Sequence, residues 1–238
     1  MCGRYTLIAN AEAIRVLFEV PAFDARLLIP RYNIAPTQPI VVVRRTETGR
    51  ELLPMRWGFI PATVKDPRVA PLHINARAES IASRPSFRGA FRYRRCLVPA
   101  SAFYEWQAQA RGPKLPFVVR RRDDAPIAFA GIWETWMGAD GSEIDTAAIV
   151  TTDANDALRG IHSRMPVVID AEDFETWLAP YTEPSVLTAL LRSAPDDLLT
   201  ATPVSARVNT VANDDPSLLD PPEAQPDAQS DPRQGSLF

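Results

Sequence analysis

The stretch Met1-Cys2-Gly3-Arg4-Tyr5 opens the sequence, and we expect the rest of the chain to be organised around it. Initiator methionine is normally removed when the next residue is small, which would leave Cys2 with both a free α-amine and a thiol. These groups titrate near ~8 and ~8.5, so both are partly nucleophilic at neutral pH. Such a 1,2-aminothiol condenses with an aldehyde to an imine, and the thiol then closes a thiazolidine ring.

Two other interpretations of Cys2 follow from the same residues. An N-terminal cysteine can act as a nucleophile with its own amine as the base. Alternatively, Cys2 is a small buried apolar residue near a frayed terminus. The remaining sequence has to decide between these chemistries.

Length and composition indicate one folded domain. The chain has 238 residues, of which 46% are hydrophobic, and this is enough for a sizeable core. No apolar run approaches the ~18 residues of a membrane span, and no signal-peptide pattern is present, so we expect a cytoplasmic protein without membrane contact. Two cysteines and two histidines (Cys2, Cys96, His73 and His162) lack the spacing of disulfide or metal sites. We therefore expect no metal or cofactor.

Charge separates the chain into two regions. Residues 214–238 contain six acids and one base, so this segment has a net charge of −5. The whole chain has a net charge of −3, which leaves +2 for residues 1–213. The segment 214–238 is also rich in proline and poor in large apolar residues, which predicts a disordered tail after a domain at 2–213. Lys65 and Lys114 are the only lysines, and the many arginines suit phosphate binding.

The hydrophobic pattern predicts an α+β fold with a mostly antiparallel, barrel-like β-sheet and peripheral helices. Strands are expected at residues 3–8, 40–43, 51–58, 96–99, 103–106, 115–120, 127–133, 143–151, 167–169 and 204–211. Helices are expected after Asn10, within 80–93 with a break at Pro85, and at 153–159, 171–178 and 184–192. The segments 31–38 and 58–71 are predicted as loops.

Arginines concentrate between residues 77 and 95. This stretch contains Arg77, Arg84, Arg88, Arg92, Arg94 and Arg95, with Glu79 as its only acid. The pattern fits either a solvated basic helix face or a track that binds phosphates. We favour the phosphate track because other polar candidates lie near it in the sequence.

Two further positions carry candidate acid–base groups. Period-two alternation places Glu105 on the face of Phe103, opposite Tyr104 and Trp106. Desolvation there would raise the pKa of Glu105 and suit it to proton transfer. His162 precedes a predicted strand, where a lone histidine is commonly structural, but the neighbouring Ser163 and Arg164 indicate an anion-facing loop.

Four blocks, in this order, resemble the SOS-response-associated peptidase (SRAP) family. They are Cys2-Gly3-Arg4-Tyr5, Asn75-Ala76-Arg77-Ala78-Glu79, Arg95-Cys96-Leu97-Val98-Pro99 with Phe103-Tyr104-Glu105-Trp106, and His162-Ser163-Arg164-Met165-Pro166. The segments 31–37 and 56–58 fit the family as well, so the resemblance covers residues 2 to about 212. Two departures are Thr63, where the family often has tryptophan, and Ala102, where we expect glycine.

The resemblance implies an abasic-site processing protein that binds single-stranded DNA and traps the ring-opened sugar on Cys2 as a thiazolidine. We expect the protein to be a monomer. It implies that Asn75 orients the N-terminus and sugar, that Glu105 shuttles protons, and that His162 protonates the sugar ring oxygen. Slow lyase activity would be a side reaction. The DNA-binding residues implied by the matching positions or adjoining the motifs are Gly3, Arg4, Asn33, Pro36, Trp57, Arg77, Arg84, Ser163 and Arg164. Trp57 is the candidate for base stacking or for a wedge.

Two other functions stay open at the level of sequence. One is an N-terminal-nucleophile cysteine peptidase or amidohydrolase, which needs an oxyanion hole that no motif identifies. The other is a non-covalent DNA-binding module in which Cys2 is incidental. Separately, Gln234-Gly235-Ser236-Leu237-Phe238 resembles the short peptide that binds the bacterial sliding clamp, and Gln234, Leu237 and Phe238 would be its anchors.

Overall fold

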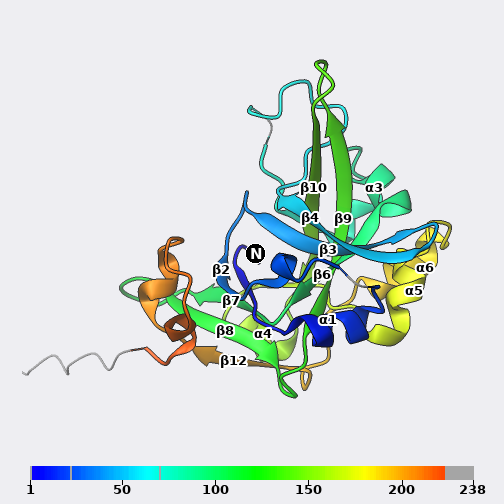
Figure 1. The fold of residues 1–238 in the computed structure, drawn as a ribbon. Coiled ribbons are helices and arrows are strands. Elements are labelled where there is room, and N and C mark those ends of the chain that lie inside the picture. Colours follow the sequence, from blue (N-terminus) through cyan, green and yellow to red (C-terminus); the bar gives the residue numbers. More distant parts are fainter. Residues whose placement is uncertain (1, 22, 70, 223–238) are drawn as a thin grey trace, which may run out of the picture.

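The fold combines a closed β-barrel with a second antiparallel sheet (Figure 1). The computed structural model describes residues 2–21, 23–69 and 71–222. The predicted clamp-binding peptide at 234–238 therefore lies outside the described residues. Within the described part, no helix is both long and apolar enough to cross a membrane.

Five strands close the barrel. Their order is β10-β4-β3-β6-β9, and β9 pairs again with β10 to complete the ring. The bounds are β3 (Pro39–Thr46), β4 (Gly49–Trp57), β6 (Arg95–Ala100), β9 (Ile127–Met137) and β10 (Glu143–Asp153). All neighbours in the ring are antiparallel except β10 and β4, so the predicted barrel-like, mostly antiparallel sheet is confirmed.

Two short strands extend the barrel beside the second half of β10. These are β5 (Asn75–Arg77), which pairs parallel to β10, and β11 (Arg164–Pro166), which pairs antiparallel to it. Thr151 on β10 is opposite Arg77 in one pairing and opposite Pro166 in the other. The Asn-Ala-Arg block and the His162 block, far apart in sequence, therefore flank the same stretch of β10.

The second sheet has the order β12-β8-β7-β1-β2 and is antiparallel throughout. Its strands are β1 (Tyr5–Leu7), β2 (Arg31–Ile34), β7 (Ala102–Gln107), β8 (Leu115–Arg121) and β12 (Leu199–Pro203). Only Ser101 separates β6 of the barrel from β7 of this sheet, and its backbone N–H donates to the carbonyl of Thr6. The two sheets are thus joined where β1 carries the N-terminal segment.

The helices are short and cover the outside of the sheets. They are α1 (Ala11–Phe18), α2 (Ala78–Ile81), α3 (Arg88–Tyr93), α4 (Asp156–Arg159), α5 (Phe174–Leu178) and α6 (Pro184–Leu190), with 3-10 turns η1 (Ala25–Leu28), η2 (Ala171–Asp173), η3 (Ala206–Asn209) and η4 (Pro216–Leu219). Asn10 caps α1 through the N–H of Ala13, and α2 and α3 lie on either side of Pro85, as predicted. The cap of α4 is Asn155, two residues beyond the predicted start.

Trp177 of α5 shows how the helices fix the barrel. Its side chain is fully buried, and its indole N–H donates to the carbonyl of Cys96 on β6 at 2.8 Å. Every residue of β6 is buried, because one face points into the barrel and the other is covered by helices. This explains why residues 96–100 of β6 form a continuous apolar run in the sequence.

Four predictions about the fold are wrong. The strand expected at 167–169 lies three residues earlier, as β11 at Arg164–Pro166, because that is the segment that pairs with β10. The segment 31–38 is not a loop throughout, since Arg31–Ile34 forms β2 and pairs with β1. The last strand is β12, and the expected strand at 204–211 contains the turn η3 instead. Residues 214–222 belong to the folded part, because Leu218 of η4 is fully buried and fills a small second core with Val204 and Val208.

Candidate active site and nucleic-acid interface

Cys2 lies inside the molecule, directly before β1. Its side chain is fully buried, and burial raises the pKa of its thiol above the ordinary value. The Glu105 carboxylate adds to this rise, while a hydrogen bond from the backbone of Arg4 opposes it. The thiol is therefore protonated at neutral pH, and it needs a base at the moment when sulfur attacks.

Glu105 is placed by the alternation of β7. Phe103 packs in the main core, and Tyr104 and Trp106 pack in the small second core on the opposite face, as the sequence predicted. Glu105 shares the Phe103 face and is only 4% exposed. Burial raises the pKa of Glu105 to about 7, which lets the carboxyl both take and give a proton near neutrality.

His162 faces Glu105 from the turn between α4 and β11. The backbone N–H of Arg164 donates to His162 Nδ1 at 2.9 Å, so the neutral ring carries its proton on Nε2. That Nε2 lies 4.0 Å from Glu105 Oε2. Burial lowers the pKa of His162, which favours this neutral form at pH 7. The predicted catalytic groups Cys2 and His162 therefore both lie close to the buried Glu105 carboxylate.

Arg164 holds this turn in position. Its guanidinium donates to Glu79 and Asp153, each at 2.7 Å, and to the carbonyl of Thr151 at 2.6 Å. The side chain is 13% exposed, and two acids at the surface, Glu79 and Asp153, pair with its charge. Arg164 thus also positions His162, and its predicted contact with DNA stays a prediction. Ser163, between them, is exposed.

Trp57 is not available to stack on a base. It is fully buried, its ring meets Tyr5 edge-on at 5.4 Å, and its indole N–H donates to the carbonyl of Ile74 at 2.9 Å. A large ring with a satisfied N–H is stable in a core, which is why the barrel retains it. Trp57 links the N-terminal segment to β5 and so helps to position Asn75.

Asn75 has an unused acceptor. Its Nδ2 donates to the carbonyl of Ile149 at 3.4 Å, whereas Oδ1 is buried and has no hydrogen-bond partner among the described residues. A buried acceptor of this kind costs about 1–3 kcal/mol unless a ligand or water satisfies it. Asn75 also lines an open pocket of about 370 Å³ together with Leu72, His73, Ile74, Arg77 and Arg84.

The predicted arginine track is only partly on the surface. Arg94 pairs with Glu134 at 2.5 Å, and Arg95 is buried. The Arg95 guanidinium donates to the carbonyls of Phe91, Arg92, Trp177 and Ala179. The four exposed members of the track are Arg77, Arg84, Arg88 and Arg92. Because Arg94 and Arg95 serve the fold, the basic surface is narrower than the sequence suggested.

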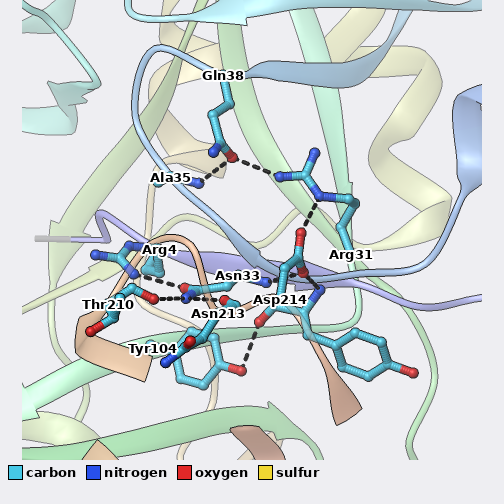
Figure 2. Close-up of polar contacts among 10 residues, drawn as sticks. Arg4, Arg31, Asn33, Ala35, Gln38, Tyr104, Thr210, Asn213 and Asp214 are labelled. Carbon is cyan, nitrogen blue, oxygen red and sulfur yellow. Dashed lines mark hydrogen bonds and ion pairs between the residues drawn. The ribbon is translucent and has the colours of Figure 1, made fainter. Parts of the chain in front are cut away.

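A polar network under the N-terminal segment involves Arg4 and Asn33 (Figure 2). Asn33 is fully buried and its Nδ2 donates to the carbonyls of Val208, Thr210 and Asn213. Its Oδ1 accepts from Arg4 at 2.7 Å, and Asp214 accepts from the backbone N–H of Asn33 at 3.0 Å. Asn33 therefore has a structural role, because its side chain joins β2 to the segment 208–213. Its predicted contact with DNA is wrong, since the side chain is fully buried. Arg4 is half-buried, and Pro36 lies in the turn after β2, half-buried as well.

Replacing Asn33 by alanine is expected to lower the free energy of unfolding by about 2–4 kcal/mol, because buried carbonyls and Arg4 lose their partner. Urea unfolding at pH 7 measures this. Asn213→Ala is the matched control, since the Asn213 side chain makes a single surface bond to the carbonyl of Arg207. An Asn33 variant as stable as the control would show that the network does not hold the segment.

Sequence reasoning missed two neighbours of the site. Lys114 is exposed and lies directly before β8, and its charge lowers the pKa of both Glu105 and His162. For Glu105, burial has the larger effect and raises the pKa. Gln107, two residues after Glu105 on the same strand, donates to the carbonyl of Gly160 at 2.9 Å and ties β7 to the His162 turn. Gln107 could have been predicted as a neighbour of the site, because residues two apart on a strand lie on the same face. Among the described residues, no cluster of His, Cys, Asp and Glu could hold a metal ion.

Comparison with known proteins agrees with this architecture. The family model described as SOS response associated peptidase (SRAP) matches residues 1–211. The chain belongs to the SRAP family.

Its relatives include proteins named as abasic site processing proteins. YoqW of Bacillus subtilis is 36% identical over 222 residues, covering 92% of this chain and 99% of the relative. YedK of Escherichia coli is 30% identical and covers 93% and 100%, and HMCES of Gallus gallus is 30% identical and covers 82% and 67%. A solved structure from Bacteroides thetaiotaomicron has a TM-score of 0.82 at 24% identity, with 92% and 99% covered, which shows the common fold.

Proposed function

We propose that this protein captures abasic sites in single-stranded DNA by a covalent bond to Cys2 after removal of Met1. The observation that carries the proposal is the burial of the Cys2 thiol close enough to Glu105 for the carboxylate to raise the pKa of the thiol. Oε2 of the same Glu105 lies 4.0 Å from His162 Nε2. The names of the relatives support abasic-site processing as the activity. The aminothiol of Cys2 supplies the chemistry that an abasic aldehyde requires.

The reaction balances with the loss of one water. The Cys2 amine attacks C1′ of the open sugar, and the resulting carbinolamine loses water to give an imine. The thiol sulfur then bonds to C1′, its proton passes to the nitrogen, and the thiazolidine closes. No oxidant or reductant is consumed. The imine is also the species from which β-elimination would break the strand, so slow lyase activity is a side reaction of the same chemistry.

Glu105 and His162 divide the proton transfers. The abasic sugar is mainly a closed hemiacetal, so its opening needs a base for the hydroxyl proton and a donor at the ring oxygen. With a pKa of about 7, Glu105 can take the first proton and later the thiol proton. His162, with its proton on Nε2, can donate to the ring oxygen. Asn75 Oδ1 is then the acceptor that orients the Cys2 amine.

The strand would reach the site across the pocket that Asn75, Arg77 and Arg84 line. Both arginines are exposed and suit phosphate oxygens. Gly3, Arg4, Pro36 and Ser163 remain proposed contacts near the lesion. Arg4 would use the N–H groups that neither Asn33 nor the carbonyl of Val208 accepts from.

An abasic-site analogue tests this proposal. We expect covalent product on denaturing gels only with an oligonucleotide whose abasic sugar can open to an aldehyde. A tetrahydrofuran analogue lacks that aldehyde, so it should bind reversibly and give no covalent band, as should undamaged DNA. Equal covalent product on the tetrahydrofuran oligonucleotide, or none on the true abasic site, would contradict the proposal.

A further inference from the structure

Three exposed arginines form a row along α3. Arg88 and Arg92 are four residues apart within α3, so their side chains lie on one face of the helix, with about 5–6 Å between their Cβ atoms. Arg84 lies in the turn that leads into α3, and its carbonyl accepts from the N–H of Arg88 at 2.9 Å, which places it at the start of the row. Ala90 and Phe91 are buried on the other side of α3 and fix the row to the barrel.

The row carries uncompensated positive charge. Arg84, Arg88 and Arg92 form no ion pair with any acid among the described residues, whereas Glu134 is taken by Arg94 and Glu79 by Arg164. Like charges four residues apart on a helix repel each other. A polyanion that binds along the row would remove this repulsion.

An aromatic platform stands at the far end of the row. Tyr93 is 51% exposed, and the guanidinium of Arg92 lies 5.4 Å from the centre of its ring. Arg88, Arg92 and Tyr93, together with Phe91 and Pro184, line a pocket of about 420 Å³. Glu183, which precedes Pro184, is the acid nearest in sequence to this pocket. A pocket with a tyrosine ring and two cations fits a nucleobase and its phosphates.

We propose that this row, Arg84-Arg88-Arg92, binds successive phosphates of the strand that flanks the abasic site, and that Tyr93 stacks on an unpaired base. The inference rests on the proposed function, because Arg84 also lines the Asn75 pocket and so joins the two sites. The partner is a single strand rather than a duplex, since paired bases cannot turn a face toward Tyr93. The α3 surface thus selects the substrate several nucleotides away from Cys2.

The test measures affinity for an oligonucleotide that carries a tetrahydrofuran site and long single-stranded flanks. For the double variant Arg88→Ala/Arg92→Ala, the slope of log K against log salt should fall by about 1.4, because each phosphate contact in a single strand contributes about 0.7. Tyr93→Ala should weaken binding at least about fivefold, and Tyr93→Phe should restore it. An oligonucleotide trimmed close to the lesion should bind all variants like the unaltered protein.

Matched controls separate these effects from loss of charge. Arg120→Ala/Arg122→Ala removes two exposed arginines from the β8 end of the other sheet, and Tyr181→Ala removes a tyrosine that is 88% exposed. If the α3 variants behave like these controls while the unaltered protein still captures abasic DNA, the inference is overturned and the proposed function stands. If the α3 variants lose binding but the unaltered protein forms no covalent product, the row is supported and the proposed function fails.

Discussion

Cys2→Ala is expected to lower covalent capture of abasic DNA by roughly 10³-fold or more, because it removes the sulfur that closes the ring. Reversible binding to the tetrahydrofuran oligonucleotide should persist, since the exposed arginines are untouched. The measurement is single-turnover product formation on denaturing gels at saturating protein. If Cys2→Ala protein still formed as much stable covalent product as the unaltered protein, with no borohydride added to trap an imine, the role of the thiol would be contradicted.

Two controls isolate the aminothiol from a simple thiol nucleophile. Cys96→Ala removes the other cysteine, which is buried on β6, and capture should continue. An alanine inserted between Met1 and Cys2 keeps the thiol but moves the amine to another residue. We expect this insertion to abolish capture, whereas an ordinary cysteine nucleophile would tolerate it.

Glu105→Gln is expected to slow capture by about 10²–10⁴-fold, the usual loss when a positioned acid–base group is removed. In the unaltered protein the rate should rise with pH through an inflection near 7, because the carboxylate form is the one that accepts protons. The variant should lack that inflection. A variant with the same pH profile as the unaltered protein would show that another group is the base.

The same substitution should stabilise the fold at higher pH. The pKa of Glu105 is about 7 in the folded state against 4.5 as its ordinary value, so between these values the folded state binds more protons than the unfolded state. Stability contributed by this group is therefore lost as pH rises through about 7. Glu105→Gln should raise the free energy of unfolding by on the order of 3 kcal/mol above pH 7 and by little near pH 4. Lower stability of the variant at pH 8 would contradict the buried-carboxyl account.

Much of the site was predictable because local periodicity determined it. The alternation around Glu105 gave its face and its burial from four residues of one strand. The Asn75 and His162 blocks were found as motifs, but their meeting beside β10 depends on a parallel pairing and an antiparallel pairing that no local pattern encodes. Tertiary pairing thus supplied what periodicity could not.

The residues placed wrongly were those whose partners are distant in sequence. The sequence pattern placed Asn33 in an exposed loop, but in the structure residues 208–214 cover its side chain. The pattern also placed Asp214 at the start of a disordered tail, but its carboxylate accepts from the backbone N–H of Asn33. In the sequence, Arg94, Arg95 and Arg164 resemble free cations. In the structure, Arg94 donates to Glu134, Arg95 donates to four backbone carbonyls, and Arg164 donates to Glu79. A charge in a sequence does not reveal whether it faces solvent or another chain segment.

Intact mass spectrometry of untagged protein mixed with a single-stranded oligonucleotide containing one abasic site tests the central claim most directly. The account predicts a species equal to the protein without Met1 plus the DNA minus one water, absent with Cys2→Ala. Treatment with borohydride should leave its mass unchanged, since a thiazolidine has no C=N bond, whereas an imine would gain two hydrogens. No adduct from protein whose Met1 is shown to be removed, or an adduct that retains Met1, would contradict it.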